Sequence, residues 1–165
     1  MWLTILLTIA SFTPNSEINS FRSLYFLANC EDSTERFLDH CNSSNSTDAV
    51  VLAYKGCAIA MSAEYSFNPF TKLSRFNEGK DLLESAVAAK PADPEIRFLR
   101  LGVQIFAPGF LNYNGQISAD TKIIVGAVKD KHWSSSPDFN SKVIAFMLKH
   151  APLSAEDKVL LTSQR

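Results

Sequence analysis

The sequence predicts an all-α fold of about seven to eight helices, arranged as stacked antiparallel hairpins. Apolar residues recur at intervals of three and four along most of the chain, and no alternating run is long enough for a strand. Only 6 of the 165 residues are glycine, about half of the roughly 12 that average usage gives, which argues against a turn-rich β fold. Three pairs of a capping residue and a proline provide helix starts.

Composition bounds the size and the class of the protein. The chain is 46% hydrophobic and 20% charged, with a formal net charge of −1. This apolar content is enough for one core, and the length is close to that of common single domains. We therefore expect a single all-α domain over residues 11–165. The small net charge gives no electrostatic reason to expect a nucleic-acid partner.

Residues 1–10 have the pattern of a signal peptide. The segment Met1–Ala10 is apolar except for threonines, and Thr8-Ile9-Ala10 is a small-x-small cleavage site. The segment is too short to cross a membrane, so we do not expect a transmembrane span. The first basic residue is Arg22, so the usual positive charge before the apolar run is missing. We expect export to a bacterial periplasm or envelope, with a buried N-terminal helix of a cytoplasmic protein as the alternative.

The first three helices are predicted from periodicity and one capping pattern. A helix begins near Glu17, and a shorter one covers 32–41, opened by the capping-box pair Asp32 and Glu35. After a polar loop, residues 48–65 are apolar on nearly all sides, which predicts a helix buried between others. Gly56 in this helix costs about 1 kcal/mol relative to Ala. We expect a close helix contact there to compensate.

Later helices are marked by their first residues. Three capping side chains each stand directly before a proline, in Asn68-Pro69, Asp93-Pro94 and Ser136-Pro137. Proline suits the first position of a helix, because the N–H that it lacks would have no partner within the helix there. Ser154, with Asp157 three residues later, has the form of a capping box. The helices expected after these starts and from periodicity cover 69–90, 94–106, 118–132, 137–150 and 153–161.

One stretch resembles a known repeat. Gly79, Leu83, Ala86 and Pro91 have the relative spacing of the second helix of a tetratricopeptide repeat, and the turn 92–95 leads into a new helix. The resemblance covers one repeat. It implies a tetratricopeptide-like core over about residues 48–132, and such helical stacks present concave surfaces to protein or peptide partners.

A wider resemblance covers about residues 54–124. The segments Phe67–Phe70, Glu95–Arg100 and Phe110–Asn114 are similar to an uncharacterised group of small exported bacterial helical proteins. This resemblance implies export and a helical-hairpin fold. It implies no activity.

The loop Phe106–Gly115 is the first candidate site. It places Phe110, Leu111 and Tyr113 beside Asn112 and Asn114, although loops are usually polar. One hypothesis is a recognition loop with aromatic anchors and amide hydrogen bonds. The alternative is that its large apolar side chains are buried and close one end of the helical stack.

A polar stripe is the second candidate site. Arg97, Arg100 and Gln104 lie three and four residues apart on one helix. They could line a groove for an anion or an acidic partner, or they could form the solvated side of an amphipathic helix. A third possibility is a structural ion pair of Arg97 with Glu64 or Glu95.

Metal and catalytic motifs are missing from the sequence. Cys30, Cys41 and Cys57 form no Cys-x-x-Cys pair, and we expect three buried thiols, with one disulfide and one buried thiol as the alternative. His40 and the two later histidines lack zinc-site spacing. No nucleophile elbow, phosphate loop or dinucleotide motif is present. We therefore expect no metal site, no cofactor and no catalytic residue.

The function that these observations favour is a non-enzymatic helical interaction or scaffold module with a protein or peptide partner. The alternative is a small ligand-binding protein or enzyme. Its pocket would be formed by the Phe106–Asn114 loop with His132 or His150 beside it.

Overall fold

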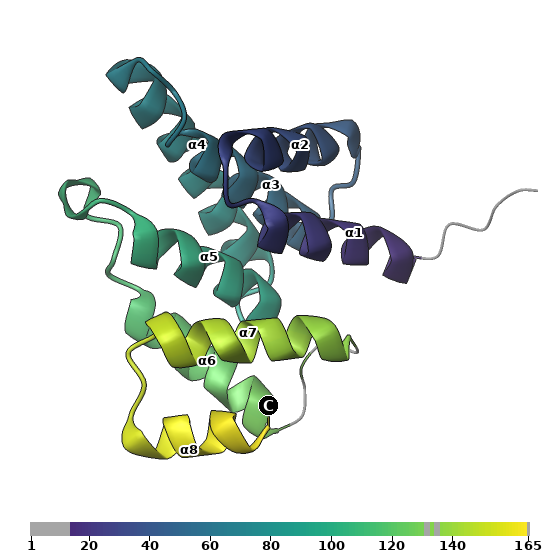
Figure 1. Ribbon diagram of the computed structural model, residues 1–165, viewed down its shortest axis with the longest axis vertical. Helices are drawn as coiled ribbons and strands as arrows, with labels where there is room; N and C mark the ends of the chain where they lie inside the picture. Colours follow the sequence, from purple (N-terminus) through teal and green to yellow (C-terminus); the bar gives the residue numbers. More distant parts are fainter. Residues whose placement is uncertain (1–13, 131–132, 134–135, 165) are drawn as a thin grey trace, which may run out of the picture.

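The protein is all-α, as the sequence predicts. The computed structural model describes residues 14–130, 133 and 136–164, and the expected signal segment at residues 1–10 lies outside this part of the chain. All regular secondary structure of the described residues is helical (Figure 1). The elements are α1 (Pro14–Leu27), α2 (Glu31–Ser43), α3 (Ala49–Ser62), α4 (Pro69–Ala89), α5 (Pro94–Phe106), the 3₁₀ helix η1 (Gly109–Leu111), α6 (Ile117–Lys129), α7 (Pro137–His150) and α8 (Ala155–Ser163).

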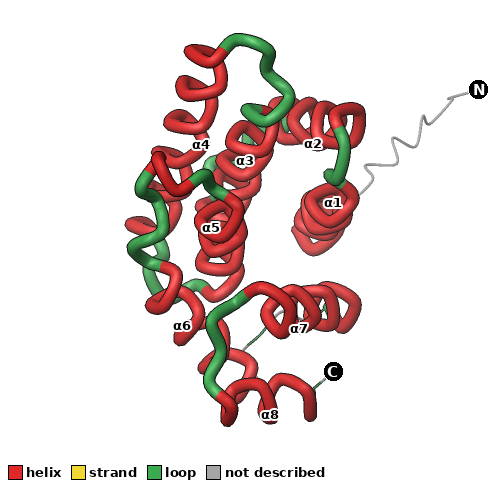
Figure 2. The backbone as a smooth tube through the Cα atoms, turned by 60° about the vertical axis from the view of Figure 1, so that its left-hand side comes forward, coloured by secondary structure: helices red, strands yellow, loops and turns green. Residues whose placement is uncertain are grey.

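Helix α3 is the centre of the arrangement. It packs against α1, α2, α4 and α5, while α6 packs against α5 and α8, and α7 packs against α8. Figure 2 shows α7 and α8 at one end of the molecule, and Figure 1 shows the first turns of α4 extending from the opposite end. Phe98 of α5 connects α1 with α7, because its ring centroid lies 5.9 Å from that of Tyr25 in α1 and 5.3 Å from that of Phe146 in α7.

The predicted proline starts are confirmed. Asn68, Asp93 and Ser136 each accept a backbone N–H hydrogen bond from the first turn of the helix that follows, and a proline occupies its first position. Ser154 and Asp157 form the expected capping box of α8. These starts were predictable because each depends on residues adjacent in sequence.

The predicted start of α2 is wrong. Its capping residue is Cys30, and the Oγ of Ser33 accepts the Cys30 N–H at 3.1 Å. The Asp32–Glu35 pair therefore lies inside the helix instead of opening it. Periodicity predicted the helix, but the hydroxyl of Ser33, and not a carboxylate of the predicted pair, accepts the N–H of the capping residue.

The expected close contact at Gly56 is confirmed. Gly56 of α3 faces Gly79 of α4, and a Cβ built on Gly56 would lie 2.7 Å from the carbonyl oxygen of Gly79. A Cβ built on Gly79 would lie 2.6 Å from the backbone nitrogen of Ala60. Both distances are below van der Waals contact, so side-chain-free residues allow the two helix backbones to touch.

Among the described residues, no helix combines the length and the apolar character that a membrane crossing requires.

Candidate functional site

The polar stripe on α5 meets a buried carboxylate of α6. Asp120 is completely buried, and its two oxygens accept four hydrogen bonds from the stripe. Arg100 donates two of these bonds, from Nη2 to Oδ1 at 2.7 Å and from Nε to Oδ2 at 2.8 Å. Arg97 Nη1 donates to Oδ1 at 2.9 Å, and Gln104 Nε2 donates to Oδ2 at 2.8 Å.

The same network continues to α4 and to the loop after α5. Arg100 Nη1 lies 2.8 Å from Oε2 of Glu84, and the Tyr113 hydroxyl donates to Oε1 of Glu84 at 2.7 Å. Gln104 Oε1 accepts the backbone N–H of Gln116 at 3.0 Å. The network thus ties α4, α5, α6 and both sides of the loop together. We call it the Asp120 network, consisting of Glu84, Arg97, Arg100, Gln104, Tyr113 and Asp120.

The surroundings of Arg100 and Tyr113 favour the protonated form of both side chains. Burial lowers the pKa of Arg100, but the hydrogen bond and the charge of Asp120, together with Glu84, outweigh burial and raise it. Burial raises the pKa of Tyr113, and its hydrogen bond to Glu84 raises it further. The guanidinium therefore stays charged and the phenol stays a neutral donor.

This geometry decides between the alternatives for the stripe. Arg100 and Gln104 are buried, so a solvated helix face is the wrong interpretation for them. The third possibility, a structural ion pair of Arg97, is the one found, but its partner is Asp120 and neither Glu64 nor Glu95. Glu95 binds Arg22 of α1 instead, at 2.6 Å.

The loop after α5 divides its side chains between the core and solvent. Leu111 and Tyr113 are half-buried and pack on a small cluster of α3 and α4 residues, in which the rings of Tyr113 and Phe76 are 5.8 Å apart. Phe110 is 85% exposed. Burial is therefore confirmed in part for Leu111 and Tyr113 and is wrong for Phe110.

The two asparagines of the loop are exposed. Asn112 has φ 50° and ends η1 in the left-handed region, which asparagine tolerates better than most residues. Its backbone N–H bonds to the carbonyl of Gly109 at 3.1 Å. The side chain of Asn114 is also on the surface, so both amides can reach a bound partner.

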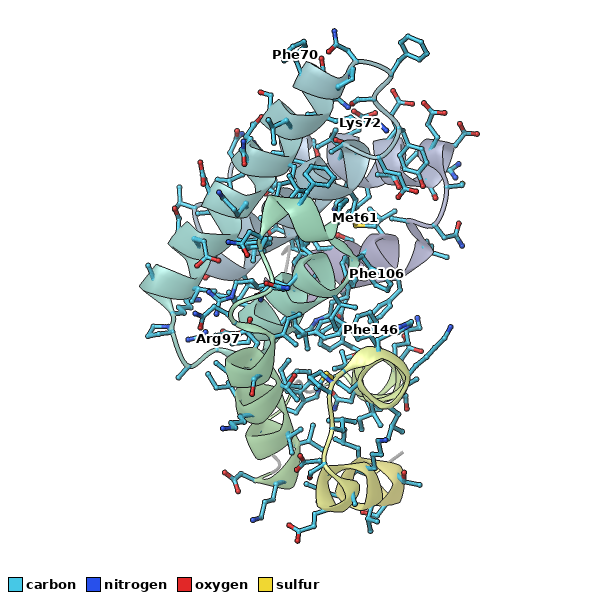
Figure 3. All side chains as sticks on the ribbon, turned by 90° about the vertical axis from the view of Figure 1, so that its left-hand side faces the viewer. Met61, Phe70, Lys72, Arg97, Phe106 and Phe146 are labelled. Carbon is cyan, nitrogen blue, oxygen red and sulfur yellow. The ribbon has the colours of Figure 1, made fainter. Side chains whose placement is uncertain are left out.

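An apolar surface lies beside this loop. Phe106, the last residue of α5, is 64% exposed, and its ring is 6.0 Å from Phe146 and 5.2 Å from His150 of α7. Figure 3 shows Met61, Phe106 and Phe146 one below another on the same side of the molecule. We call this surface the Phe106 face, consisting of Met61, Phe106, Phe146 and His150 together with the exposed Phe110, four residues after Phe106 on the adjoining loop.

Sequence reasoning missed a contact between a serine and a histidine. Ser20 Oγ of α1 lies 2.7 Å from Nε2 of His40 in α2, and also 2.7 Å from the carbonyl oxygen of Glu17. The hydroxyl has one hydrogen. When it bonds the Glu17 carbonyl, Nε2 must donate to Ser20, which is the reverse of what an activated nucleophile needs. The contact joins α1 to α2.

The cysteines and histidines form no metal centre in the described part of the chain, where no three metal-binding side chains gather. All three cysteines are free; Cys41 and Cys57 are buried, but Cys30 is exposed, so the expectation of three buried thiols is wrong for it. His150 lies against Phe106 and Phe146. His132 lies outside the described residues.

A small cavity lies between α1 and α7. Its volume is about 60 Å³, and Arg22, Phe26, Asp138 and Lys142 are among its lining residues. Small-molecule sites usually enclose about 300–1,000 Å³, so this cavity has room only for a few water molecules. A shallow, open apolar hollow follows α8 and is lined by Val159 and its neighbours.

Comparison of the chain with known protein families, with curated proteins and with solved structures finds no match.

Proposed function

We propose that the chain is a non-enzymatic, tetratricopeptide-like helical module that binds an apolar peptide or protein segment on the Phe106 face. The observation that carries this proposal is the exposure of Phe106 and Phe110, at 64% and 85%, beside a loop that the Asp120 network holds at both sides. Aromatic side chains supply much of the binding energy at protein interfaces.

The fixed loop strengthens this proposal. Association costs free energy for every segment that becomes ordered on binding, and a preordered loop lowers that cost. Gln104 holds the loop through Gln116 N–H, and Glu84 holds it through the Tyr113 hydroxyl. Phe110 therefore projects from a defined backbone.

The predicted partner-binding residues then have two kinds of role. Phe110, Asn112 and Asn114 offer exposed groups to the partner. Leu111 and Tyr113 anchor the loop to the core. Two residues of the stripe also hold the loop: Gln104 Oε1 accepts the Gln116 N–H, and Arg100 binds Glu84, which accepts the Tyr113 hydroxyl. Arg97 binds Asp120 of α6 and the carbonyl oxygen of Pro91.

We place this module in the periplasm or envelope of a bacterium, on the pattern of residues 1–10 and the resemblance to exported helical proteins. The alternative, an enzyme or ligand-binding protein with a pocket at the Phe106–Asn114 loop, has less support. The two cavities described above lie between α1 and α7 and along α8.

Peptide selection tests the proposal. Peptides displayed on phage are selected on the full chain, and their affinity is measured for Phe110→Ser and for Val159→Ser. Val159 is a matched control because it is a 72% exposed apolar residue on α8, outside the Phe106 face. We expect the selected peptides to be rich in apolar residues. Phe110→Ser should bind them at least tenfold more weakly than the unmodified chain, and Val159→Ser should bind them equally well. Failure to select peptides, or equal loss in both variants, would contradict the proposal.

A further inference from the structure

The first two turns of α4 form a projecting tip. Every residue from 67 to 75 is exposed, and Figure 1 shows this end of α4 extending beyond the neighbouring helices. Asn68 caps the helix by accepting the Phe70 N–H at 2.8 Å, and Pro69 occupies its first position. We call residues 67–75 the α4 tip.

The α4 tip carries large apolar side chains that the fold does not use. Phe67 is fully exposed, Phe70 is 84% exposed and Leu73 is 47% exposed. The buried face of α4 begins only at Phe76, one turn after the last of them, and continues through Gly79. Single exposed apolar residues are common, but two almost bare phenylalanines with a leucine on one short tip form a candidate interaction surface.

The tip is also positively charged. Between Tyr65 and Asn77 the only charged residues are Lys72 and Arg75, although the whole chain has a net charge of −1. Lys72 Nζ donates to the carbonyl oxygen of Glu64 at 2.9 Å, so it lies where α3 ends and α4 begins, and both basic side chains stay exposed. Acidic residues border this stretch only at its two ends, Glu64 and Glu78.

We propose that the α4 tip inserts into the interfacial region of an anionic lipid bilayer. A convex tip offers a protein partner little area unless that partner has a matching groove, whereas a bilayer interface accepts small protruding aromatic groups directly. The phenylalanines enter the boundary of the acyl chains, and Lys72 and Arg75 lie at the level of the anionic headgroups.

This attachment goes beyond the proposed peptide binding and uses different residues. The α4 tip comprises residues 67–75, while the Phe106 face is formed by α3, the end of α5, its loop and α7. A protein held at a membrane by the tip could therefore bind its partner at the same time.

Vesicle flotation of the full chain tests the insertion. The vesicles are phosphatidylcholine alone and phosphatidylcholine mixed with phosphatidylglycerol. We expect Phe67→Ser/Phe70→Ser to bind the mixed vesicles at least tenfold more weakly than the unmodified chain, since two side chains lose their apolar contact. Phe110→Ser and Val159→Ser serve as controls and should bind unchanged. Residues 1–10 are present in every variant, so their contribution is common to all.

A fluorescent label reports the depth of the tip itself. An environment-sensitive dye is attached at Phe70→Cys or at Val159→Cys, each in a Cys30→Ser background that removes the exposed native thiol. We expect a blue shift with mixed vesicles only at position 70. Phosphatidylglycerol should increase the vesicle affinity of the unmodified chain, and this increase should be about fivefold smaller for Lys72→Gln and for Arg75→Gln.

Two results would overturn the proposal. The first is a dye at position 70 that gives the same spectrum with and without vesicles, even where the chain floats with them. The second is a tip variant that loses the selected peptides but keeps its vesicle binding, because the tip would then belong to a protein-binding site.

Discussion

Arg100 and Asp120 form a two-bond ion pair that is sealed from solvent. The bonds measure 2.7 and 2.8 Å, the Asp120 side chain has no exposed surface, and that of Arg100 is 4% exposed. Removing two charges from water costs several kcal/mol for each ion, so the folded state depends on the bonds between them. Arg97 and Gln104 complete the shell of donors around the same carboxylate.

Asp120→Asn should therefore destabilise the protein strongly. The substitution keeps the shape of the side chain but leaves the Arg100 guanidinium buried without an opposite charge at Asp120, which costs about 3–5 kcal/mol in comparable pairs. Urea unfolding followed by circular dichroism measures the loss. Asp138→Asn is the control, because Asp138 forms its ion pair with Lys142 on the surface and should cost less than about 1 kcal/mol. Equal losses of stability from the two substitutions would show that the Arg100–Asp120 ion pair contributes no more to stability than an exposed one.

Substitution by alanine should have opposite effects on stability at Gly79, which lies in the contact of α3 with α4, and at Gly126, which lies outside it. Gly79→Ala places a methyl group against the backbone of Ala60 and Gly56, so the helices must move apart, and we expect a loss of about 1–3 kcal/mol. Gly126→Ala in α6 meets nothing within 4 Å and should stabilise by up to about 1 kcal/mol through helix propensity. Thermal unfolding of the two variants gives the signs directly. A stabilising Gly79→Ala would contradict the close contact.

Local features of the fold were predictable from sequence, but the role of Asp120 at the centre of the Asp120 network was not. The caps at Asn68, Asp93 and Ser136 depend on neighbouring residues, so sequence patterns revealed them. The stripe of Arg100 and its neighbours was visible as a spacing, but its acceptor is 20 residues away on another helix.

Exposure was equally hard to predict. Phe110 and Phe76 are the same residue type in a helical protein, yet one is on the surface and the other in a core cluster. Phe76 lies in the helix predicted over 69–90, where apolar residues recur at helical spacing, whereas the loop around Phe110 has no repeat from which the direction of its side chain could be predicted. Only the tertiary position of the loop, held by Tyr113 and Gln104, turns Phe110 outward.

Tyr113→Phe should loosen the loop without unfolding the protein. The variant loses the hydrogen bond from its hydroxyl to Glu84 and keeps the ring contact with Phe76, so we expect a loss of about 1 kcal/mol. Hydrogen exchange should become faster over residues 106–116 and stay unchanged in α3. Tyr65→Phe, outside the network, is the matched control. Unchanged exchange in the loop would mean that the Glu84 bond does not hold it.

The cysteines should differ widely in reactivity. Hydrogen bonds from Ser33 lower the pKa of Cys30, whose thiol is exposed, while burial raises the pKa of Cys41 to about 12 and that of Cys57 well above its usual range. Because the thiolate is the reactive form, iodoacetamide should modify Cys30 first in the folded protein. Mass spectrometry identifies the site, and unfolding in urea should make all three react.

Ser33→Ala is the matching variant for this assay. It removes the side-chain hydrogen bond of Ser33, the first cause of the lowered pKa of Cys30, and keeps the bond from the backbone N–H of residue 33, so the modification of Cys30 at neutral pH should slow. Modification of Cys41 at the same rate as Cys30 would contradict the buried position of Cys41.

Alkaline pH should destabilise the protein through three tyrosines, the buried Tyr54 and the half-buried Tyr25 and Tyr113. Burial raises the pKa of Tyr25, Tyr54 and Tyr113, and Glu95 and Glu84 add to the shift at the latter two. An unfolded tyrosine ionises near pH 10, so above this pH the unfolded chain releases protons that the folded chain keeps. The free energy of unfolding must then fall as pH rises, by about 1.4 kcal/mol per pH unit for each protected tyrosine.

The buried thiols act in the same direction. An unfolded cysteine loses its proton near pH 8.5, whereas the folded pKa of Cys41 is about 12 and that of Cys57 is also raised. Urea unfolding between pH 7 and 11 should therefore show full stability at the neutral end and a decline that begins near pH 8.5 and steepens above about pH 10. Tyr113→Phe should make the free energy of unfolding fall less steeply above pH 10, by about the 1.4 kcal/mol per pH unit that one protected tyrosine contributes. Tyrosinate absorbance should rise together with unfolding for these three phenols, and their ionisation in the still-folded chain would contradict their burial.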